Sequence, residues 1–404
     1  MAVNPASASG SAGRLLAGPG VPGLRTLRSA RFRLVVALTL ATVAALVLGS
    51  VLLRQASDPN GQFAFDFAAY HAAALDLAAG RSPYDPQMLA GPIPSQGEVL
   101  YKYPPLLAQV LTPLAALPLN AAAAIWLVAQ GLMILAGVWL AARAGGAAQS
   151  AETLAGVAVA AMFFLPCFDT LWKGNVSGVL ALAVGVAIAG GAAGGFGAAA
   201  AALVKTTPVV LLLPAIAAGR GSWLGMAAWL PMVALSIVAS PGAWHDFVRV
   251  LPNLVTGASV YATNVAPHSL VAFAWPAAPA LVEAVRLAAL GAGGAALLRA
   301  ALLARRPGRW PAAVTLAVAA LLLLPSATWY HYLAVVLPVA AFHWPRLPAR
   351  GRVGLLAAGT AVSFGLVWLP LAAAGAAAML VVSLWAGVGS RPDARPLPAA
   401  GAAT

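Results

Sequence analysis

The sequence predicts an all-α, polytopic integral membrane protein with about 11–13 transmembrane helices, because apolar runs long enough to cross a hydrocarbon core of about 30 Å recur along it. Hydrophobic residues make up 62% of the 404 residues, and charged residues make up only 8%. A typical soluble domain carries about 25% charged residues. A water-soluble fold could not cover so much apolar surface with polar groups, so the partner of this surface is expected to be a lipid bilayer.

The charged residues are strongly basic, with 23 Lys and Arg against 10 Asp and Glu and a formal net charge of +13. In a soluble protein this excess would suggest nucleic acid as a partner. Here the basic residues stand in short segments beside the apolar runs, as topology determinants do. We therefore expect no nucleic-acid partner. The single cysteine, Cys167, excludes an internal disulfide and a cysteine-rich metal site.

The chain is predicted to have two disordered, basic, cytosolic tails, at residues 1–33 and 390–404, around a transmembrane domain at residues 34–389. The first apolar run continues to Arg54, which is too long for a cleavable signal peptide, so it is expected to remain as the first span. The positive-inside rule then keeps both termini in the cytosol.

Residues 54–103 are expected to form a long first outer loop. Connections usually have about 4–6 residues, and much longer ones are usually functional or disordered. Within the loop, Phe65–Ala79 has helical propensity and ends at Gly80, so it predicts a helix lying at the membrane interface. The loop holds five of the ten acidic residues, namely Asp58, Asp66, Asp76, Asp85 and Glu98.

Nine further apolar runs predict spans. The stretch Pro104–Leu119 is short and contains Pro113, so it either crosses the membrane thinly or lies on its surface. The expected spans are Ala121–Ala142, Thr153–Phe168, Val176–Gly190, Trp223–Ala239, Ala280–Leu303, Pro311–Leu324, His331–Phe342, Val353–Leu371 and Ala374–Gly389.

The segment Gly197–Ala218 breaks this simple alternation, because Lys205-Thr206-Thr207-Pro208 lies within it. As one helix it would place Arg220 outside, against the charge rule. Proline removes a helical hydrogen bond, so we expect a hairpin of two half-helices with Lys205 near the outer face. Such a break is tolerated only where it is buried in protein or lines a cavity.

Lys205 is the sharpest functional candidate, since ionisable residues at membrane depth are costly and usually functional. The alternative is a lysine that extends its side chain to water. With threonines and a helix break beside it, an anion site is favoured, and phosphate is a natural ligand for a lysine and freed backbone N–H groups.

Asp66 lies among aromatic residues just beyond the first span, where partial desolvation would suit a general base. Tyr70 lies one turn further on the same helix face. A helix N-cap is an equally good interpretation of Asp66 from spacing alone. Asp76 and Asp85 are interpreted as solvated or turn carboxylates.

Two more short segments carry polar groups at the outer face. The turn from Asp169 to Asn175 offers a carboxylate, a lysine (Lys173) and an amide, and is either a plain loop or part of a site. The segment Trp329-Tyr330-His331-Tyr332 offers aromatic walls suited to a sugar and a histidine suited to proton relay, although a lone histidine is more often structural. Tyr261, Asn264 and His268 lie in a second outer loop and are candidates for lining a substrate path.

No nucleotide or metal motif accompanies these residues. The chain has no P-loop, no dinucleotide glycine motif and no His-Glu-x-x-His. Asp66 has no acidic neighbour, whereas hard cations need several oxygen ligands. We therefore expect neither a metal nor a cofactor.

Five short motifs follow one another along the chain: Asp66-Phe67-x-x-Tyr70, Gly80-Arg81-Ser82-Pro83-Tyr84, Tyr103-Pro104-Pro105-Leu106, Lys205-Thr206-Thr207-Pro208 and Trp329-Tyr330-His331-Tyr332. In this order they resemble the motifs of glycosyltransferase family 87. Lys173-Gly174-Asn175 lies where that family often has a Gly-Gln-x-Asn-like turn, without the glutamine. The family comprises bacterial polyprenol-phosphate-mannose-dependent α-mannosyltransferases with the glycosyltransferase C fold.

The resemblance implies a role for each matching position. Asp66 would be the general base of an inverting displacement, and His331 would bind or help protonate near the same centre. Lys205, with Lys173, would hold the donor phosphate. The substrate pocket would be shaped by Tyr70, Tyr103, Asn175, Trp329 and Tyr330.

The resemblance also implies the substrates: a polyprenyl-phosphate-sugar donor, with mannose as the sugar, and a glycolipid or glycan acceptor. The reaction would take place on the outer face of the bacterial plasma membrane. A transporter or lipid-carrier flippase is the main alternative, although the chain shows no evident internal repeat and its polar residues gather at one face. A scaffold protein would need neither Lys205 nor a long acidic loop.

Overall fold

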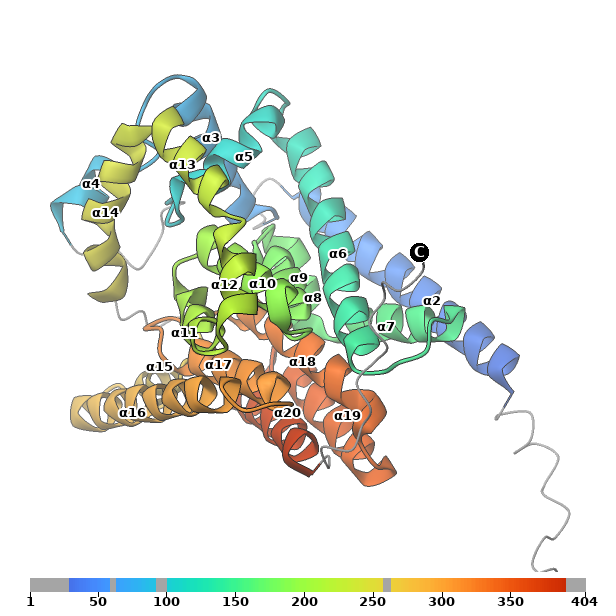
Figure 1. The fold of residues 1–404 in the computed structure, drawn as a ribbon. Coiled ribbons are helices and arrows are strands. Elements are labelled where there is room, and N and C mark those ends of the chain that lie inside the picture. Colours follow the sequence, from blue (N-terminus) through green and yellow to red (C-terminus); the bar gives the residue numbers. More distant parts are fainter. Residues whose placement is uncertain (1–28, 59–62, 92–99, 257–262, 390–404) are drawn as a thin grey trace, which may run out of the picture.

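The computed structural model describes residues 29–58, 63–91, 100–256 and 263–389 and is all-α (Figure 1). Within these ranges the helices are joined by turns, and one isolated antiparallel bridge pairs Asn264 with Trp329. Most of the two predicted tails, together with Glu98 and Tyr261, lies outside the described residues.

The chain is a polytopic membrane protein. Five stretches of the described residues are long and apolar enough to span a membrane. A sixth span results if the bent pair of α7 (Ala151–Phe163) and α8 (Leu165–Lys173) counts as one. The five are α2 (Ala30–Ala56), α6 (Leu119–Ala144), α12 (Arg220–Ala227) continued by α13 (Leu230–Ala239), α16 (Pro279–Ala304) and α20 (Leu369–Gly389).

Shorter helices complete the bundle. The remaining elements are α3 (Phe65–Ala78), α4 (Pro86–Ala90), α5 (Pro105–Ala115), α7 (Ala151–Phe163), α8 (Leu165–Lys173), α9 (Ser177–Ala187), α10 (Gly191–Val204), η1 (Thr207–Leu211), α11 (Leu212–Ala217), α14 (Pro241–Thr256), α15 (Pro267–Ala274), α17 (Trp310–Leu323), η2 (Tyr330–Val335), α18 (Val336–His343), η3 (Trp344–Arg346) and α19 (Ala349–Phe364).

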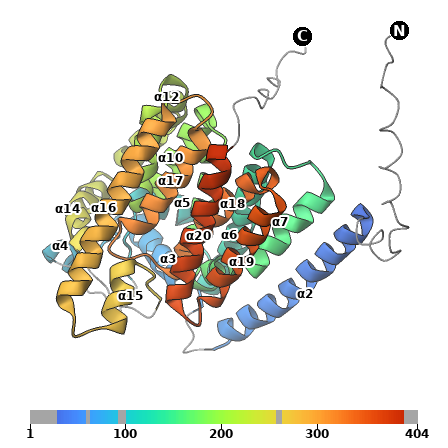
Figure 2. The same cartoon turned by 90° about the horizontal axis from the view of Figure 1, so that it is seen from below.

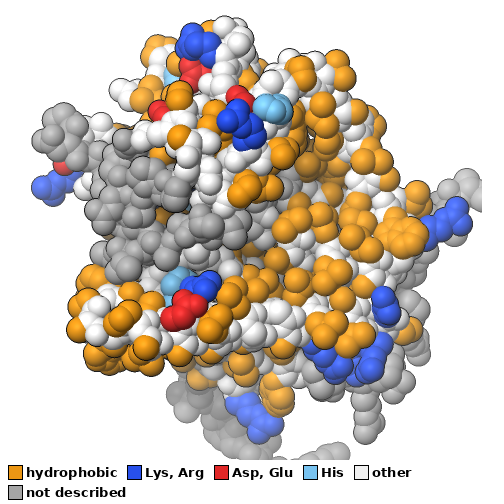
Figure 3. All heavy atoms as spheres, turned by 90° about the vertical axis from the view of Figure 1, so that its left-hand side faces the viewer, with side chains coloured by type: hydrophobic (Ala, Val, Ile, Leu, Met, Phe, Trp, Pro, Cys, Tyr) orange, Lys and Arg blue, Asp and Glu red, His pale blue; other side chains and the backbone are white. Residues whose placement is uncertain are grey.

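One end of the bundle carries paired basic side chains. Arg33 at the start of α2 forms a salt bridge of 2.6 Å with Glu152 at the start of α7. Arg346 donates to the backbone oxygen of Ala144 at the end of α6. The starts of α2 and α7 and the end of α6 therefore lie at the same end of the bundle. Helix α2 packs mainly along α7, at the side of the bundle (Figure 2). On the face seen in Figure 3, hydrophobic side chains cover much of the described surface and charged side chains stand in a few small groups.

The predicted hairpin after α10 is present. The helix ends at Lys205, whose backbone is extended, and η1 and α11 then return the chain. Ser222 in α12 donates from its hydroxyl to the backbone oxygen of Gly191, at the start of α10. Arg220 therefore lies near the beginning of α10, opposite the end that carries Lys205.

Two expected spans differ from the structure, and a third segment, left open between crossing the membrane and lying on its surface, is decided by the length of its helix. The predicted span Thr153–Phe168 is bent by 69° between α7 and α8, where Pro166 stands in the first turn of α8. The predicted span Val353–Leu371 is wrong at its end, because α19 stops at Phe364 and Gly365 packs tightly against Ala372. The 11 residues of α5 reach only about 16 Å, too short to cross a membrane alone.

The juxtamembrane helix α3 agrees with its prediction, ending at Ala78 before Gly80 with a φ of +71°. It packs on α5 and α6 through an aromatic core that includes Phe67, Tyr70 and Trp126. The segment predicted as the first outer loop is thus tied to the membrane bundle by buried side chains.

Candidate active site

Asp66 is placed by an unusual start to α3. Ala64 adopts a left-handed backbone with φ 55°, and its N–H donates to the backbone oxygen of Trp172 at 2.8 Å. Ala64 is the N-cap residue and no side chain caps the helix, so the interpretation of Asp66 as an N-cap is wrong. The strained residue instead joins the start of α3 to the end of α8, which brings Asp66 to the α8–α9 turn.

Asn175 in that turn binds Asp66 directly. Its Nδ2 donates to Asp66 Oδ2 at 2.7 Å and approaches the Tyr70 hydroxyl at 3.4 Å. Its Oδ1 accepts from the backbone N–H and the hydroxyl of Ser177, at 3.0 and 2.7 Å. These two acceptor contacts fix the orientation of the amide, so its N–H groups face the carboxylate.

Tyrosines form the wall beside this carboxylate. The Tyr70 hydroxyl donates to the Tyr103 hydroxyl at 2.9 Å, and their rings meet edge to face. Burial raises the pKa of both phenols, and the nearby negative charge of Asp66 raises it further. Both therefore remain protonated hydrogen-bond donors near neutral pH.

Gly174 allows the α8–α9 turn to lie against α3. It has a φ of +65°, and a Cβ at this position would lie 2.7 Å from Cβ of Phe67. Its backbone oxygen accepts from Trp126 Nε1 at 2.7 Å. Glycine is therefore required here both for its backbone conformation and for close approach.

Lys205 lies in the same cluster, enclosed by tyrosines. It is only 7% exposed. Its Nζ hydrogen-bonds to the Tyr332 hydroxyl and lies 3.8 Å from the centroid of the Tyr332 ring and 4.9 Å from that of Tyr103. The ammonium does not extend to water, and it lies within electrostatic reach of the Asp66 carboxylate.

His331 also faces Asp66. Its Nε2 is 4.0 Å from Asp66 Oδ2, while its Nδ1 is 3.2 Å from Oδ2 of Asp169 in α8. The His331 and Asp169 side chains are 8% and 6% exposed. The structure thus joins Asp66, Tyr70, Tyr103, Asn175, Lys205 and His331 in one cluster.

Three residues that contact this cluster or lie near it were not selected from the sequence as site residues. Asp169 contacts His331, Tyr332 contacts Lys205, and Lys102 lies within electrostatic reach of both Asp66 and Lys205. Burial lowers the pKa of Lys102, while Asp66 acts in the opposite direction. Their positions in polar outer segments were visible in the sequence, but the pairings depend on the fold.

Three predicted site residues make other contacts. Lys173 Nζ lies 4.9 Å from the centroid of the Trp172 ring. Trp329 pairs its backbone with Asn264. Tyr330 is buried, and its hydroxyl donates to the backbone oxygen of Val362 at 2.9 Å, away from Asp66.

Internal hydrogen bonds hold the described part of the segment predicted as the second outer loop. Asn264 Oδ1 accepts from the backbone N–H groups of Ala266 and Thr328, and its Nδ2 donates to Ser269. His268 Nε2 is 3.0 Å from the backbone oxygen of Ser326. These contacts give Asn264 and His268 a role in shaping the loop.

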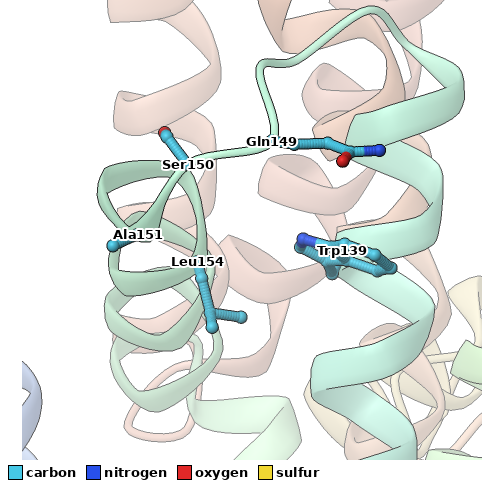
Figure 4. Close-up of a pocket in the computed structure, with 5 residues that line it drawn as sticks. All are labelled: Trp139, Gln149, Ser150, Ala151 and Leu154. Atoms are coloured by element: carbon cyan, nitrogen blue, oxygen red, sulfur yellow. The ribbon is translucent and has the colours of Figure 1, made fainter.

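Two spaces open outside the Asp66 cluster. A space of about 420 Å³ opens between α6 and α7, lined by Trp139, Gln149, Ser150, Ala151 and Leu154 (Figure 4). A smaller one of about 240 Å³ lies beside α3 and α4 and includes Asp76 and Asp85. In agreement with their interpretation, Asp76 pairs with Arg81 and Asp85 caps α4.

Comparison with known proteins identifies the family. The family model of glycosyltransferase family 87 matches residues 101–325, more than half of the chain. The chain belongs to glycosyltransferase family 87. No curated protein matches it.

Membership of family 87 makes this all-α protein a membrane glycosyltransferase, with a sugar donor and an acceptor as substrates. The matched region contains Tyr103, Lys173, Asn175 and Lys205. Asp66 and His331 lie outside it, and the contacts of the fold connect them to the matched region.

Proposed function

We propose that this family 87 protein transfers mannose from a polyprenyl-phosphate donor to a glycolipid or glycan acceptor, with inversion at the anomeric carbon and without a metal. The observation that carries the proposal is the cluster itself. Asp66 contacts Asn175 and faces His331, and the enclosed ammonium of Lys205 lies within its electrostatic reach.

In the proposed reaction, Asp66 is the general base. It takes the proton from the acceptor hydroxyl as the acceptor oxygen bonds to the anomeric carbon of the donor. The bond from that carbon to the phosphate oxygen breaks, and its electron pair leaves with the polyprenyl phosphate. Asn175 donates to Asp66 Oδ2 and so orients the carboxylate that takes this proton.

Lys205 is proposed to stabilise the departing phosphate. Its enclosure by Tyr103 and Tyr332 keeps water away, so its charge acts at short range where negative charge develops. Lys173 is proposed as a second phosphate contact. Tyr70, Tyr103, Asn175, Trp329 and Tyr330 are proposed to shape the substrate pocket.

The proposed location is the outer face of the bacterial plasma membrane, with both termini in the cytosol. Support comes from the basic end of the bundle, where Arg33 and Arg346 meet the ends of α7 and α6. The Asp66 cluster lies at the far end of α7–α8, next to the α8–α9 turn. By the positive-inside rule the basic end faces the cytosol, which leaves the cluster outside.

The test is transfer by the purified full-length protein in liposomes. Radiolabelled polyprenyl-phosphate-mannose is supplied with a bacterial lipid-glycan extract, and matched reactions contain the glucose or arabinose donor. We expect label in the acceptor fraction from the mannose donor, unchanged by EDTA. Transfer only from another sugar donor would overturn the mannose assignment, and loss of transfer with EDTA would overturn metal independence. A folded protein that moves the donor across the bilayer without transferring label would contradict the proposed reaction.

A further inference from the structure

Asp169 is a buried carboxylate with no role in the proposed reaction steps. It lies in α8 with a side chain only 6% exposed. Placing an ionised carboxylate in such surroundings costs several kcal/mol unless a partner compensates for the lost water. The partner in this structure is the imidazole of His331, with 3.2 Å between Asp169 Oδ2 and His331 Nδ1.

His331 stands between two carboxylates with its two nitrogens in different situations. Nδ1 faces Asp169, whereas Nε2 points toward Asp66 at 4.0 Å. That Nε2 atom is buried and has no hydrogen-bond partner among the described residues. A buried polar atom without a partner is costly, and it indicates a group that acquires its partner when substrate or a proton arrives.

Packing between α8 and η2 keeps Asp169 and His331 next to each other. Helix α8 packs against η2, and the Thr170 hydroxyl lies 3.4 Å from the backbone oxygen of His331 and 2.8 Å from that of Pro166. The His331 ring also meets the ring of Tyr332 edge to face. The backbone of His331 is therefore fixed against α8, its ring contacts Asp169 and Tyr332, and its Nε2 faces Asp66.

Resting on the proposed function, we propose that Asp169 is a positioning residue that holds His331 with its proton on Nδ1 and the lone pair of Nε2 directed at Asp66. In this arrangement His331 receives at Nε2 the proton that Asp66 has taken from the acceptor hydroxyl. The imidazolium that forms is stabilised by the buried Asp169 carboxylate, and Asp66 returns to its anionic form. A histidine held by a carboxylate in this way is a recurring device of proton-transfer catalysis.

The test uses two readouts on the full-length protein in liposomes. The first is transfer kinetics, compared between wild type and Asp169→Asn. We expect kcat to fall by about 100-fold or more while the KM for the donor stays within about twofold, because the proton path is lost and donor contacts remain. The control is Asp85→Asn, in which asparagine keeps the N-cap of α4 and transfer is expected to be unchanged.

The second readout does not depend on activity. Nitrogen-15 NMR of ring-labelled histidine, with the His331 signal assigned by its loss in His331→Gln, reports which nitrogen carries the proton. At pH 8 we expect a proton on Nδ1 alone in the wild type, and a mixture of the two neutral forms in Asp169→Asn. A wild-type ring protonated on Nε2 or on both nitrogens, or a ring unchanged by Asp169→Asn, would overturn the role of Asp169.

The two proposals fail separately. If the wild type transfers no sugar from any donor, the proposed function fails, and the NMR spectra still decide whether Asp169 sets the protonated nitrogen of His331. If the wild type transfers mannose and Asp169→Asn does so at an unchanged rate, only the positioning role fails.

Discussion

Asn175 Nδ2 donates to Asp66 Oδ2 at 2.7 Å, across 109 residues of chain. Both residues lie where helices begin: Asp66 in the first turn of α3, and Asn175 just before α9. The contact joins α3 to the turn between α8 and α9. It gives the proposed base a fixed direction.

Replacing Asp66 by Asn should abolish transfer without unfolding the protein. The amide has nearly the same shape but cannot take the acceptor proton, so we expect kcat to fall by about 10²–10⁴-fold. Single-turnover transfer of radiolabelled mannose measures this, with the unfolding temperature in detergent as the check on folding. A rate near that of the wild type would refute the base assignment.

Replacing Asn175 by Asp should lower kcat for sugar transfer. Two carboxylates would then face each other within hydrogen-bonding distance, and like charges so close cannot both be ionised. They would share a proton, so in a fraction of the protein molecules Asp66 is protonated and cannot act as the base. We expect at least a tenfold loss of kcat at pH 7, with partial recovery as pH rises and the shared proton leaves. A flat response to pH would contradict this account.

Replacing Lys205 by Ala should weaken use of the donor far more than replacing Lys173 by Ala. Lys205 lies within electrostatic reach of Asp66, whereas Lys173 Nζ lies over the Trp172 ring. We expect kcat/KM for the donor to fall by about 10²–10³-fold for Lys205→Ala, the range for loss of one charge-stabilising group. For Lys173→Ala we expect less than a tenfold loss. Equal effects of the two variants would remove Lys205 from its central role.

Replacing Gly174 by Ala should destabilise the outer end of the bundle. Alanine at φ +65° costs about 1–2 kcal/mol, and contact with Phe67 adds about 1–3 kcal/mol of overpacking. Gly80→Ala is the matched control, since Gly80 has a φ of +71° but open space around it. The unfolding temperature in detergent should fall further for Gly174→Ala. Equal decreases would show that crowding against Phe67 contributes nothing.

Cysteine labelling tests which face carries the site. After Cys167 is replaced by Ala, single cysteines at Asp76 and Arg350 are treated with an impermeant maleimide. We expect Asp76→Cys to react in intact cells, because α3 belongs to the outer loop. Arg350→Cys, at the start of α19 beside the basic end, should react only after lysis. The reverse pattern would place the Asp66 cluster in the cytosol.

The helical membrane fold and several local features were predictable because they follow from local chemistry. The long apolar runs predicted α2, α6 and α16 within a few residues, and glycine at position 80 predicted the end of α3. Pro208 beside Lys205 predicted the hairpin after α10. The end of α19 was not predicted, because apolar residues continue past Phe364 and the close approach of Gly365 to Ala372 is visible only in the fold.

The site was predictable only in part. Lys205 was selected because an ionisable group at membrane depth is costly, and Asp66 because aromatic neighbours would desolvate its carboxylate. His331 was selected for its aromatic neighbours and its proton-relay chemistry, together with the resemblance to family 87. The choice between base and N-cap for Asp66 could not be made from spacing, since it depends on the backbone of Ala64 and on a contact with Trp172. Asp169 was visible in the sequence as a turn carboxylate, and nothing local indicated that it would be buried against His331.

The sequence by itself determined that this chain crosses a membrane as helices and concentrates its polar groups at one end, because hydrophobic length and charge placement are set residue by residue. Only the tertiary structure decided which of those groups meet. The bend between α7 and α8 and the left-handed residue before α3 bring Asp169, Asn175 and Asp66 together. Such pairings arise from the packing of helices distant in sequence, where burial makes each unpaired charge costly and so selects the partner.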